Sequence, residues 1–480
     1  MRCLFYIISS VLLIGCVHYE SKPLDAPQSA KQLQTRSLDS PELKAFLEKN
    51  LSSGITTWPL PSWSFEQLAL AAYFYHPNME VARAQWRTAE AVVLTAGGRP
   101  NPTVSLTPGF NSDAANGVSP WMPVVSFDIP IETAHKRDFR IAVAQSLSHS
   151  AKFNISTTAW QVRSNLRTAL LNFIAAERRE TLLRSGQENQ NRILASLKQN
   201  EAAGAIARNE VRPALIAANR LALDLLEARR QAQEARARIA EAIGVPVNEL
   251  VKRQFTFDFS NKPIPPDDLH QAQEIALKGR SDILSALADY AAMESTLQLE
   301  IAKQYPDVHI SPNYQWDQGE SKWALGVTVE LPLLNRNQGP IAEAKARREE
   351  AAAKFVALQA KVLSEIELAL ASYHASVEQQ GAVDELLKIQ REQLNSIEAQ
   401  EKAGAMTQLD RLTAQTEINA AELSRFESEV KIQQSLAALE DALQRPFSSE
   451  RAFVEPEVSS FPQTTPTAAK GSSKKTKSKR

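Results

Sequence analysis

Residues 308–331 of this chain read VHISPNYQWDQGESKWALGVTVEL, and they form two runs separated by Gln318-Gly319. Apolar and polar residues alternate in each run, and aromatic residues such as Trp316 and Trp323 stand near the ends. An alternation of period two gives a strand one apolar and one polar face. Runs of about ten residues with this pattern and aromatic ends are typical of strands in a transmembrane barrel. The stretch therefore predicts a hairpin of two membrane-spanning strands.

A similar pair of runs occurs earlier in the chain, at 103–110 and 126–131. The alternating apolar residues there are Val104, Leu106, Pro108, Phe110, Phe127, Ile129 and Ile131. The alternative is a half-buried sheet of a soluble protein, which would need another layer to cover its apolar face. The helices expected in this chain are too long for that role, so we expect four transmembrane strands.

The chain contains two copies of one unit. Four landmarks recur in the same order at a spacing of about 200 residues. Recurrence at a fixed spacing indicates an internal repeat. They are Glu201 to Ala205 with Glu401 to Ala405, Ala242 to Pro246 with Ala442 to Pro446, Pro102 with Pro306, and Asp128 to Pro130 with Glu330 to Pro332. Chance matches in alanine-rich sequence would not preserve this order. We expect repeats at 63–250 and 267–447, joined by a proline-rich linker at 251–266.

Each repeat is expected to contain a helix, two strands, a long helix and a return helix. The first helices are predicted at 65–97 and 269–303, and the long helices at 133–200 and 340–402. At 1.5 Å per residue each long helix would span about 95–100 Å. Helices of this length need neighbouring helices along their whole length, as in coiled coils. Glycine at the far end of each long helix predicts a tight turn into a return helix, the first of which covers about 205–243.

The N-terminus resembles a lipoprotein leader. Residues 4–14 form an apolar run that is too short to span a bilayer as a helix and is typical of a signal peptide. The run ends in Leu13-Ile14-Gly15-Cys16, which resembles a bacterial lipobox, where the chain is cut before the cysteine and lipid is attached to its sulfur. We expect a signal peptide at 1–15 and a lipidated linker at 16–62. An ordinary secretory signal with an incidental cysteine is the alternative.

Composition argues against several other classes of protein. The 480 residues carry a formal net charge of −1, which does not suit a nucleic-acid binder. No phosphate-binding loop, nucleophile elbow or zinc-protease motif occurs, and the seven histidines are scattered. We therefore expect neither an enzyme nor a cofactor or metal site. The basic segment 448–480 is expected to be disordered.

Four strands determine the expected assembly. They cannot close a barrel, and an open strand edge cannot exist in lipid. Two chains would give eight strands, whose interior is filled by side chains, whereas three would give twelve strands and room for an aqueous lumen. The expected fold is therefore mainly α with a transmembrane β portion, in a trimer with a 12-stranded β-barrel and a long periplasmic α-helical barrel.

Two such helix–hairpin–helix units, joined by a proline-rich link and preceded by a lipobox, resemble the TolC-like outer-membrane efflux family over about residues 60–447. Segments 98–102 and 131–137 look most like its heavy-metal (cobalt–zinc–cadmium) branch. The resemblance implies a homotrimer in the outer membrane that extends into the periplasm. It also implies two protein partners, a periplasmic adaptor and a proton-driven inner-membrane pump of the RND type, for the efflux of heavy-metal cations or drugs.

The resemblance assigns functional residues to the two helix-hairpin tips. An adaptor is expected to dock at the turns formed by Gly204, Ala205, Ile206, Gly404, Ala405 and Met406. Glu210 and Asp410 lie six residues past the tip glycines, where the family has an acidic residue at its periplasmic constriction. Three Asp410 carboxylates in a trimer would form a ring that attracts cations, with Arg208 and Arg411 tying neighbouring helices together. An acid in the first turn of a helix also has a structural reason, because it complements the helix dipole.

Two other functions remain open from the sequence. The chain could be the exit duct of a protein-secretion system with an ABC exporter, since sequence does not separate these cargos. It could also be a periplasmic helical scaffold or adaptor lipoprotein without a barrel. Adaptors usually present a single hairpin, whereas two hairpins and four alternating strands are expected here.

Overall fold

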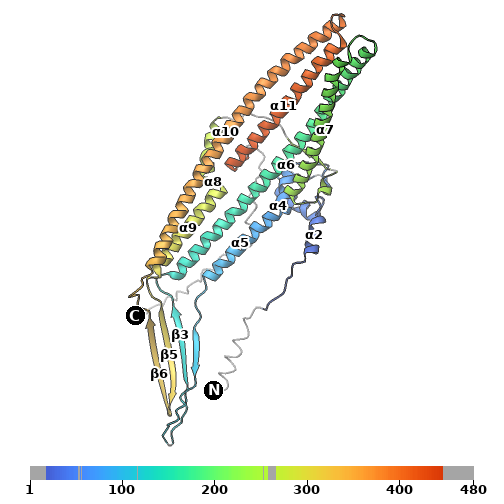
Figure 1. The fold of residues 1–480 in the computed structure, drawn as a ribbon. Helices are drawn as coiled ribbons and strands as arrows, with labels where there is room; N and C mark the ends of the chain where they lie inside the picture. Colours follow the sequence, from blue (N-terminus) through green and yellow to red (C-terminus); the bar gives the residue numbers. More distant parts are fainter. Residues whose placement is uncertain are drawn as a thin grey trace, which may run out of the picture.

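The computed structural model describes residues 18–446, apart from 52–53, 56, 116, 252 and 258–265. The expected signal peptide, the lipidation candidate Cys16 and the basic tail at 448–480 lie outside the described residues. A sheet lies at one end of the molecule, and long helices run from its base to two helix-hairpin tips at the opposite end (Figure 1).

The long helices confirm the prediction from sequence. Helix α6 (Lys136–Ala202) has 67 residues and helix α10 (Gln338–Lys402) has 65. The return helices α7 (Arg208–Ile243) and α11 (Gln408–Leu443) have 36 residues each. The helices form a layer in which α6 lies between α7 and α11, and α11 between α6 and α10 (Figure 1). Among the described helices, none is both long enough and apolar enough to cross a membrane.

The first helix of each repeat was expected to be continuous, at 65–97 and at 269–303. Each of them is broken into two helices, so this part of the prediction is wrong. The first consists of α4 (Phe65–Tyr75) and α5 (Pro77–Ala96). His76 precedes a proline, which disfavours helical backbone, and it is extended with φ −66° and ψ 125°. The second consists of α8 (Pro266–Gly279) and α9 (Ser281–Ala302).

Arg280 forms the second break, with an extended backbone at φ −60° and ψ 135°. Its guanidinium donates to the carbonyl of Ala442 at 2.5 Å and pairs with Asp282 at 2.7 Å. The Gln444 side chain accepts from the Ser281 backbone N–H at 2.9 Å, which satisfies a free donor at the start of α9. This break is therefore imposed by the distant end of α11.

The four expected strands form one antiparallel sheet in the order β2-β3-β5-β6, so the two repeats share it. The strands are β2 (Thr103–Thr107), β3 (Val124–Ile131), β5 (Val308–Asp317) and β6 (Glu320–Val329). Strand β2 ends three residues before the predicted end of its run. Strands β2 and β6 are the edge strands.

The register of the sheet puts apolar residues opposite apolar residues. Pairs such as Val104 with Phe127, Ile129 with Ile310, and Tyr314 with Trp323 lie across from each other, as do the polar pairs Ser105 with Ser126 and His309 with Thr328. Because side chains alternate between faces, the four strands together have one apolar and one polar face. This register confirms the alternation predicted from sequence.

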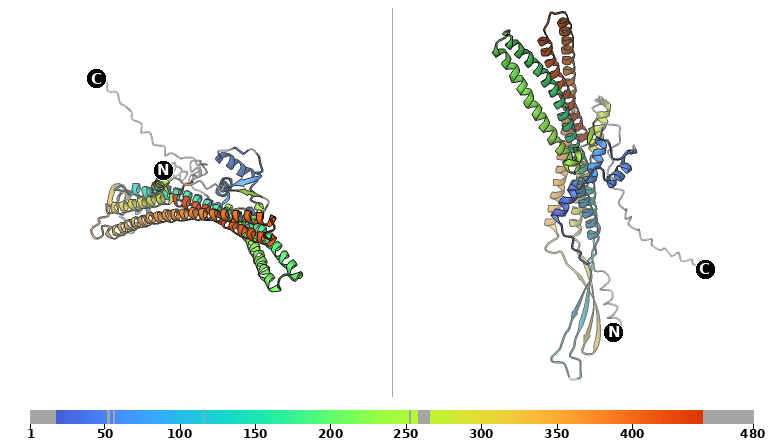
Figure 2. Two further views of the ribbon diagram at one scale, coloured as in Figure 1. Left: turned by 90° about the horizontal axis from the view of Figure 1, so that it is seen from above. Right: turned by 90° about the vertical axis from the view of Figure 1, so that its right-hand side faces the viewer.

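The segment expected to be a linker at 16–62 contains folded elements. Helices α2 (Ala26–Gln34) and α3 (Pro41–Asn50) are followed by β1 (Ser62–Ser64), which pairs in parallel with β4 (Gln254–Thr256) from the other expected linker. We call α2, α3, α4, β1 and β4 the belt, and it lies on one face of the helical layer (Figure 2). Its core is the main hydrophobic cluster, where Leu43 and Leu47 are fully buried with Trp63 and Leu166 of α6.

Candidate functional site: the helix-hairpin tips and their anchors

The two tips have the same turn geometry. Gly204 and Gly404 adopt left-handed backbone with φ of 74° and 77°, a conformation that glycine tolerates best. In each turn the next backbone N–H closes on the long helix, from Ala205 to the Asn200 carbonyl and from Ala405 to the Gln400 carbonyl, both at 2.9 Å. Ile206 is half-buried, and the other expected docking residues of the tips are exposed. The tips are therefore available to a partner in the single chain.

Asp410 and Glu210 begin the return helices. The Asp410 carboxylate accepts from the Thr407 backbone N–H at 2.8 Å, and the Thr407 hydroxyl accepts from the Asp410 N–H at 3.3 Å. This reciprocal pair is a capping box, and its hydrogen bonds from Thr407 hold the pKa of Asp410 below the usual range. Glu210 accepts from the Ala207 backbone N–H at 3.0 Å. Both acids therefore have a structural role at a helix start, and their role in a gate remains a prediction.

The two arginines near the tips differ. Arg411 Nε lies 2.8 Å from Glu401 Oε2, so it ties α11 to α10 within one hairpin. Arg208 is exposed and makes no hydrogen bond or ion pair within the described part of the chain. Arg411 thus braces one hairpin, and ties between neighbouring helices at a gate remain a prediction for both arginines.

A buried amide joins the two hairpins near their tips, and sequence reasoning missed it. Asn189 Nδ2 on α6 donates to the Leu412 carbonyl and to Thr416 Oγ1 on α11, both at 2.8 Å. The Asn189 side chain is buried, so breaking these bonds would leave its donors without partners. This contact links the first repeat to the second where a gate is expected.

A second missed link holds the other end of α11. Arg163 and Arg167 of α6 both pair with Glu440 of α11, and all three side chains are buried. Asp441 beside them accepts a hydrogen bond from the Ser164 hydroxyl, and burial raises the pKa of Asp441. Phe65 of the belt covers the Arg163 guanidinium at 4.9 Å. The second hairpin is thus fixed to the first repeat at belt level.

Ionisable pairs on the sheet include Lys322 with Asp317 at 2.6 Å near the β5–β6 turn and His309 with Asp128 on the polar face. His309 Nδ1 lies 3.0 Å from Asp128 Oδ2 across β5 and β3. Among the described residues no three potential ligands converge as a metal site. The His309–Asp128 pair is accounted for as a hydrogen bond between neighbouring strands.

Paired helical hairpins, a shared four-stranded sheet and a belt on one face of the helical layer define a channel subunit of the efflux type. The family model described as outer membrane efflux protein matches residues 71–245 and 273–444, one match in each repeat. The chain belongs to this family, as the TolC-like resemblance predicted.

Curated relatives and solved structures agree with this assignment. The chain is 24% identical over 484 residues to the pyoverdine export outer membrane protein OpmQ of Pseudomonas aeruginosa, covering 93% of this chain and 97% of that protein. It is 22% identical over 283 residues to the cobalt-zinc-cadmium resistance protein CzcC of Cupriavidus metallidurans, covering 58% of this chain and 65% of that protein. The fold is similar to that of the outer membrane protein VceC of Vibrio cholerae, with a TM-score of 0.66 at 19% identity over 80% of this chain and 96% of that one.

Proposed function

We propose that this chain forms a trimeric exit duct in the outer membrane. The observation that carries the proposal is the sheet of the single chain. Its apolar face is uncovered, with Leu325 and Val327 of β6 exposed by 70% and 64%, and the outer edges of β2 and β6 pair with no other strand among the described residues. Three copies joined edge to edge would satisfy both edges and turn the apolar face to lipid, giving 12 strands.

The helical layer supports the same assembly. Helices α7 and α10 are its two outer members, and each carries exposed apolar side chains. These include Ile216, Leu223 and Leu226 on α7 and, at the same level of the layer, Val377, Leu386 and Ile389 on α10. Joining α10 of one copy to α7 of the next would bury both rows and close a periplasmic helical barrel.

The duct would be passive and would act with two partners. A periplasmic adaptor is proposed to dock at the two tips, and a proton-driven inner-membrane pump of the RND type would supply the energy. The substrates proposed are small solutes, either heavy-metal cations or drugs. The uncovered apolar sheet argues against a scaffold without a barrel, and a protein cargo with an ABC exporter is the alternative to be tested.

The protein is also proposed to be lipid-anchored through Cys16. Cys16→Ser would prevent lipid attachment and leave the signal peptide uncleaved by the lipoprotein peptidase. Intact mass spectrometry of the purified wild-type chain measures this directly. A mature wild-type chain without acyl mass would contradict the anchor and leave the duct proposal standing.

The duct itself is tested by assembly and conductance. Chemical crosslinking in detergent should give trimers. The full sequence of one chain has a mass of 53.0 kDa. The same trimers should form ion-conducting pores in planar bilayers. A monomer that does not conduct would overturn the proposal. Transport and metal-sensitivity assays of a deletion strain then distinguish metal cations, drugs and exported proteins as cargo.

A further inference from the structure

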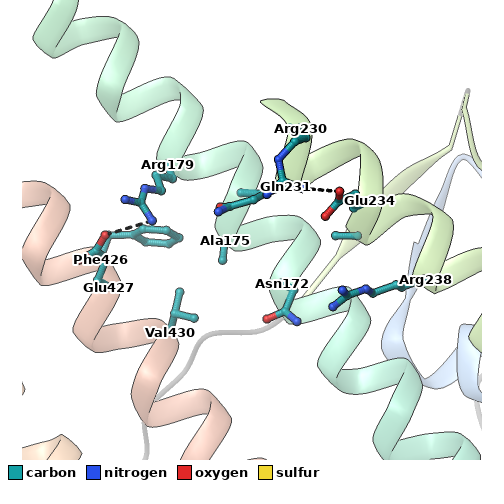
Figure 3. A pocket seen from close by; sticks show the side chains of 12 residues that line it. Asn172, Ala175, Arg179, Arg230, Gln231, Glu234, Arg238, Phe426, Glu427 and Val430 are labelled. Atoms are coloured by element: carbon teal, nitrogen blue, oxygen red, sulfur yellow. Dashed lines mark hydrogen bonds and ion pairs between the residues drawn. The ribbon is translucent and has the colours of Figure 1, made fainter. Parts of the chain in front are cut away.

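A polar groove runs along the layer of long helices, with α6 as its floor and α7 and α11 as its walls (Figure 3). It has a volume of about 730 Å³. It continues into a second groove of about 890 Å³, which shares Asn172 and Arg238 with the first and adds side chains such as Gln161 and Asn165. Arg238 therefore stands where the two grooves meet.

The first groove is lined by more arginines than acidic residues. Arg179 lies 3.7 Å from Glu427, and Arg230 pairs with both Glu234 and Glu227. These contacts leave Arg238, which makes no hydrogen bond or ion pair within the described residues, and Figure 3 shows its side chain extending from α7 toward Asn172. The carboxylate of Glu241, which lines the second groove, forms no ion pair with it. One guanidinium with free donors thus faces the groove.

The groove opens on the face opposite the belt. Leu166, Leu170 and Phe173 of α6 pack into the belt core, whereas Thr168, Asn172 and Ala175 line the grooves. Each groove residue follows a core residue by two positions, which is about 200° around a helix of 3.6 residues per turn. The layer of helices curves away from the belt (Figure 2), so in a closed ring of copies the belt would lie outside and the groove would face the lumen.

We propose that this groove is a subsite for organic anions in transit through the duct, one in each subunit. The free Arg238 guanidinium suits the two oxygens of a carboxylate or a similar oxyanion. Asn172 offers an amide beside it, and Phe426 and Val430 on α11 give the wall an apolar surface for the body of the ligand. The subsite rests on the proposed function, because it requires the face to line a lumen.

The test uses the full-length trimer in planar bilayers, with 2-naphthoate as the probe and neutral 2-naphthamide as its uncharged match. In wild type, 2-naphthoate should reduce the current at concentrations where 2-naphthamide does not. Arg238→Gln should weaken this block by about two- to fivefold, the range for loss of one solvent-exposed ion pair. It should also shift the reversal potential in a salt gradient toward cations.

Arg229→Gln is the matched control, since it removes the same charge from the opposite side of α7. Arg229 pairs with Glu180 at 3.0 Å and does not line the groove. Its block by 2-naphthoate should equal that of wild type. Equal weakening in both variants, equal block by the amide, or no change in Arg238→Gln would each overturn the subsite while the pore stands. A wild-type trimer that does not conduct would overturn the proposed function and the subsite with it.

Discussion

The Asp410 carboxylate joins a structural role to an expected role in conduction. Its hydrogen bonds with Thr407 lower its pKa in the folded state, so it favours folding at any pH above the usual carboxyl range. This contribution is lost as the pH falls through the lowered pKa. At neutral pH Asp410 is therefore a fixed negative charge, and three of them near one axis would attract cations.

Replacing Asp410 separates the two roles. Asp410→Asn keeps a side-chain acceptor for Thr407 and removes the charge, whereas Asp410→Ala removes both. Block of the pore by divalent cations added on the periplasmic side should weaken in both variants, measured as single-channel current. Wild-type block in Asp410→Asn would show that Asp410 acts only at the helix start.

Residues near the tips differ in how far sequence could identify them. Gly404 and Asp410 were predictable because a helix turn and a helix start are local patterns. Asn189 was not, because its acceptor Leu412 is 223 positions away and an asparagine inside a long helix has no pattern of its own. Arg163 and Arg167 were missed for the same reason, since their partner Glu440 belongs to the other repeat.

At the scale of elements, strand β6 allows a direct test of which face meets lipid. Val327 pairs with Ile310 on the apolar face, and Thr328 pairs with His309 on the polar face. Val327→Arg should destabilise the barrel by about 2–4 kcal/mol if it lies near the bilayer midplane. Thr328→Arg should be tolerated. The yield of trimer in outer membranes measures the difference, and equal damage from both would contradict the assigned faces.

The tips provide a second test at this scale. Ala205 and Ala405 are exposed and small, and small side chains allow close approach of a partner helix. Replacing both with tryptophan should abolish the cell's resistance to the exported metal cations or drugs, while trimers remain in the membrane. Site-specific crosslinking to the adaptor measures docking, with Ala205→Ser and Ala405→Ser as the small control. Undiminished crosslinking of the tryptophan variant would rule out the tips as the docking site.

Long, regular elements were predicted well because their patterns repeat over many residues. The belt was missed because its elements are short, and α3, β1 and β4 become stable only when their apolar residues pack with those of α4 and α6. The break at Pro77 had a visible signal in its proline, but the break at Arg280 depends on Gln444, the residue that follows α11. Contacts between repeats, rather than local propensity, decide these boundaries.

At the scale of the whole molecule, the two repeats are joined along their length, including the packing of α6 on α9. They share one sheet through β3 and β5, they meet near the tips through Asn189, and they are tied at belt level through Glu440. The belt-level link is the most buried of these, with Arg163, Arg167 and Glu440 exposed by only 4%, 5% and 2%. It fixes the end of α11 that lies farthest from the tip.

Removing one partner of this link should lower the free energy of unfolding much more than replacing the whole link with apolar residues. Glu440→Gln would leave two buried guanidiniums without their carboxylate and should cost about 3–5 kcal/mol of unfolding free energy. Glu343→Gln is the control, since it breaks an exposed pair with Arg347 and should cost about 0–1 kcal/mol. Urea unfolding of the detergent-solubilised trimer, followed by circular dichroism, gives both values.

The triple change Arg163→Met, Arg167→Leu and Glu440→Leu removes the three charges of these ion pairs and fills the space with apolar side chains, while Asp441 keeps its hydrogen bond from Ser164. Buried ion pairs are often replaced in this way without loss of stability, so the triple variant should unfold at a urea concentration near that of wild type. Its tips should then close as in wild type, giving the same resting conductance. If Glu440→Gln were no less stable than Glu343→Gln, the belt-level charges would not be what holds the second hairpin to the first repeat.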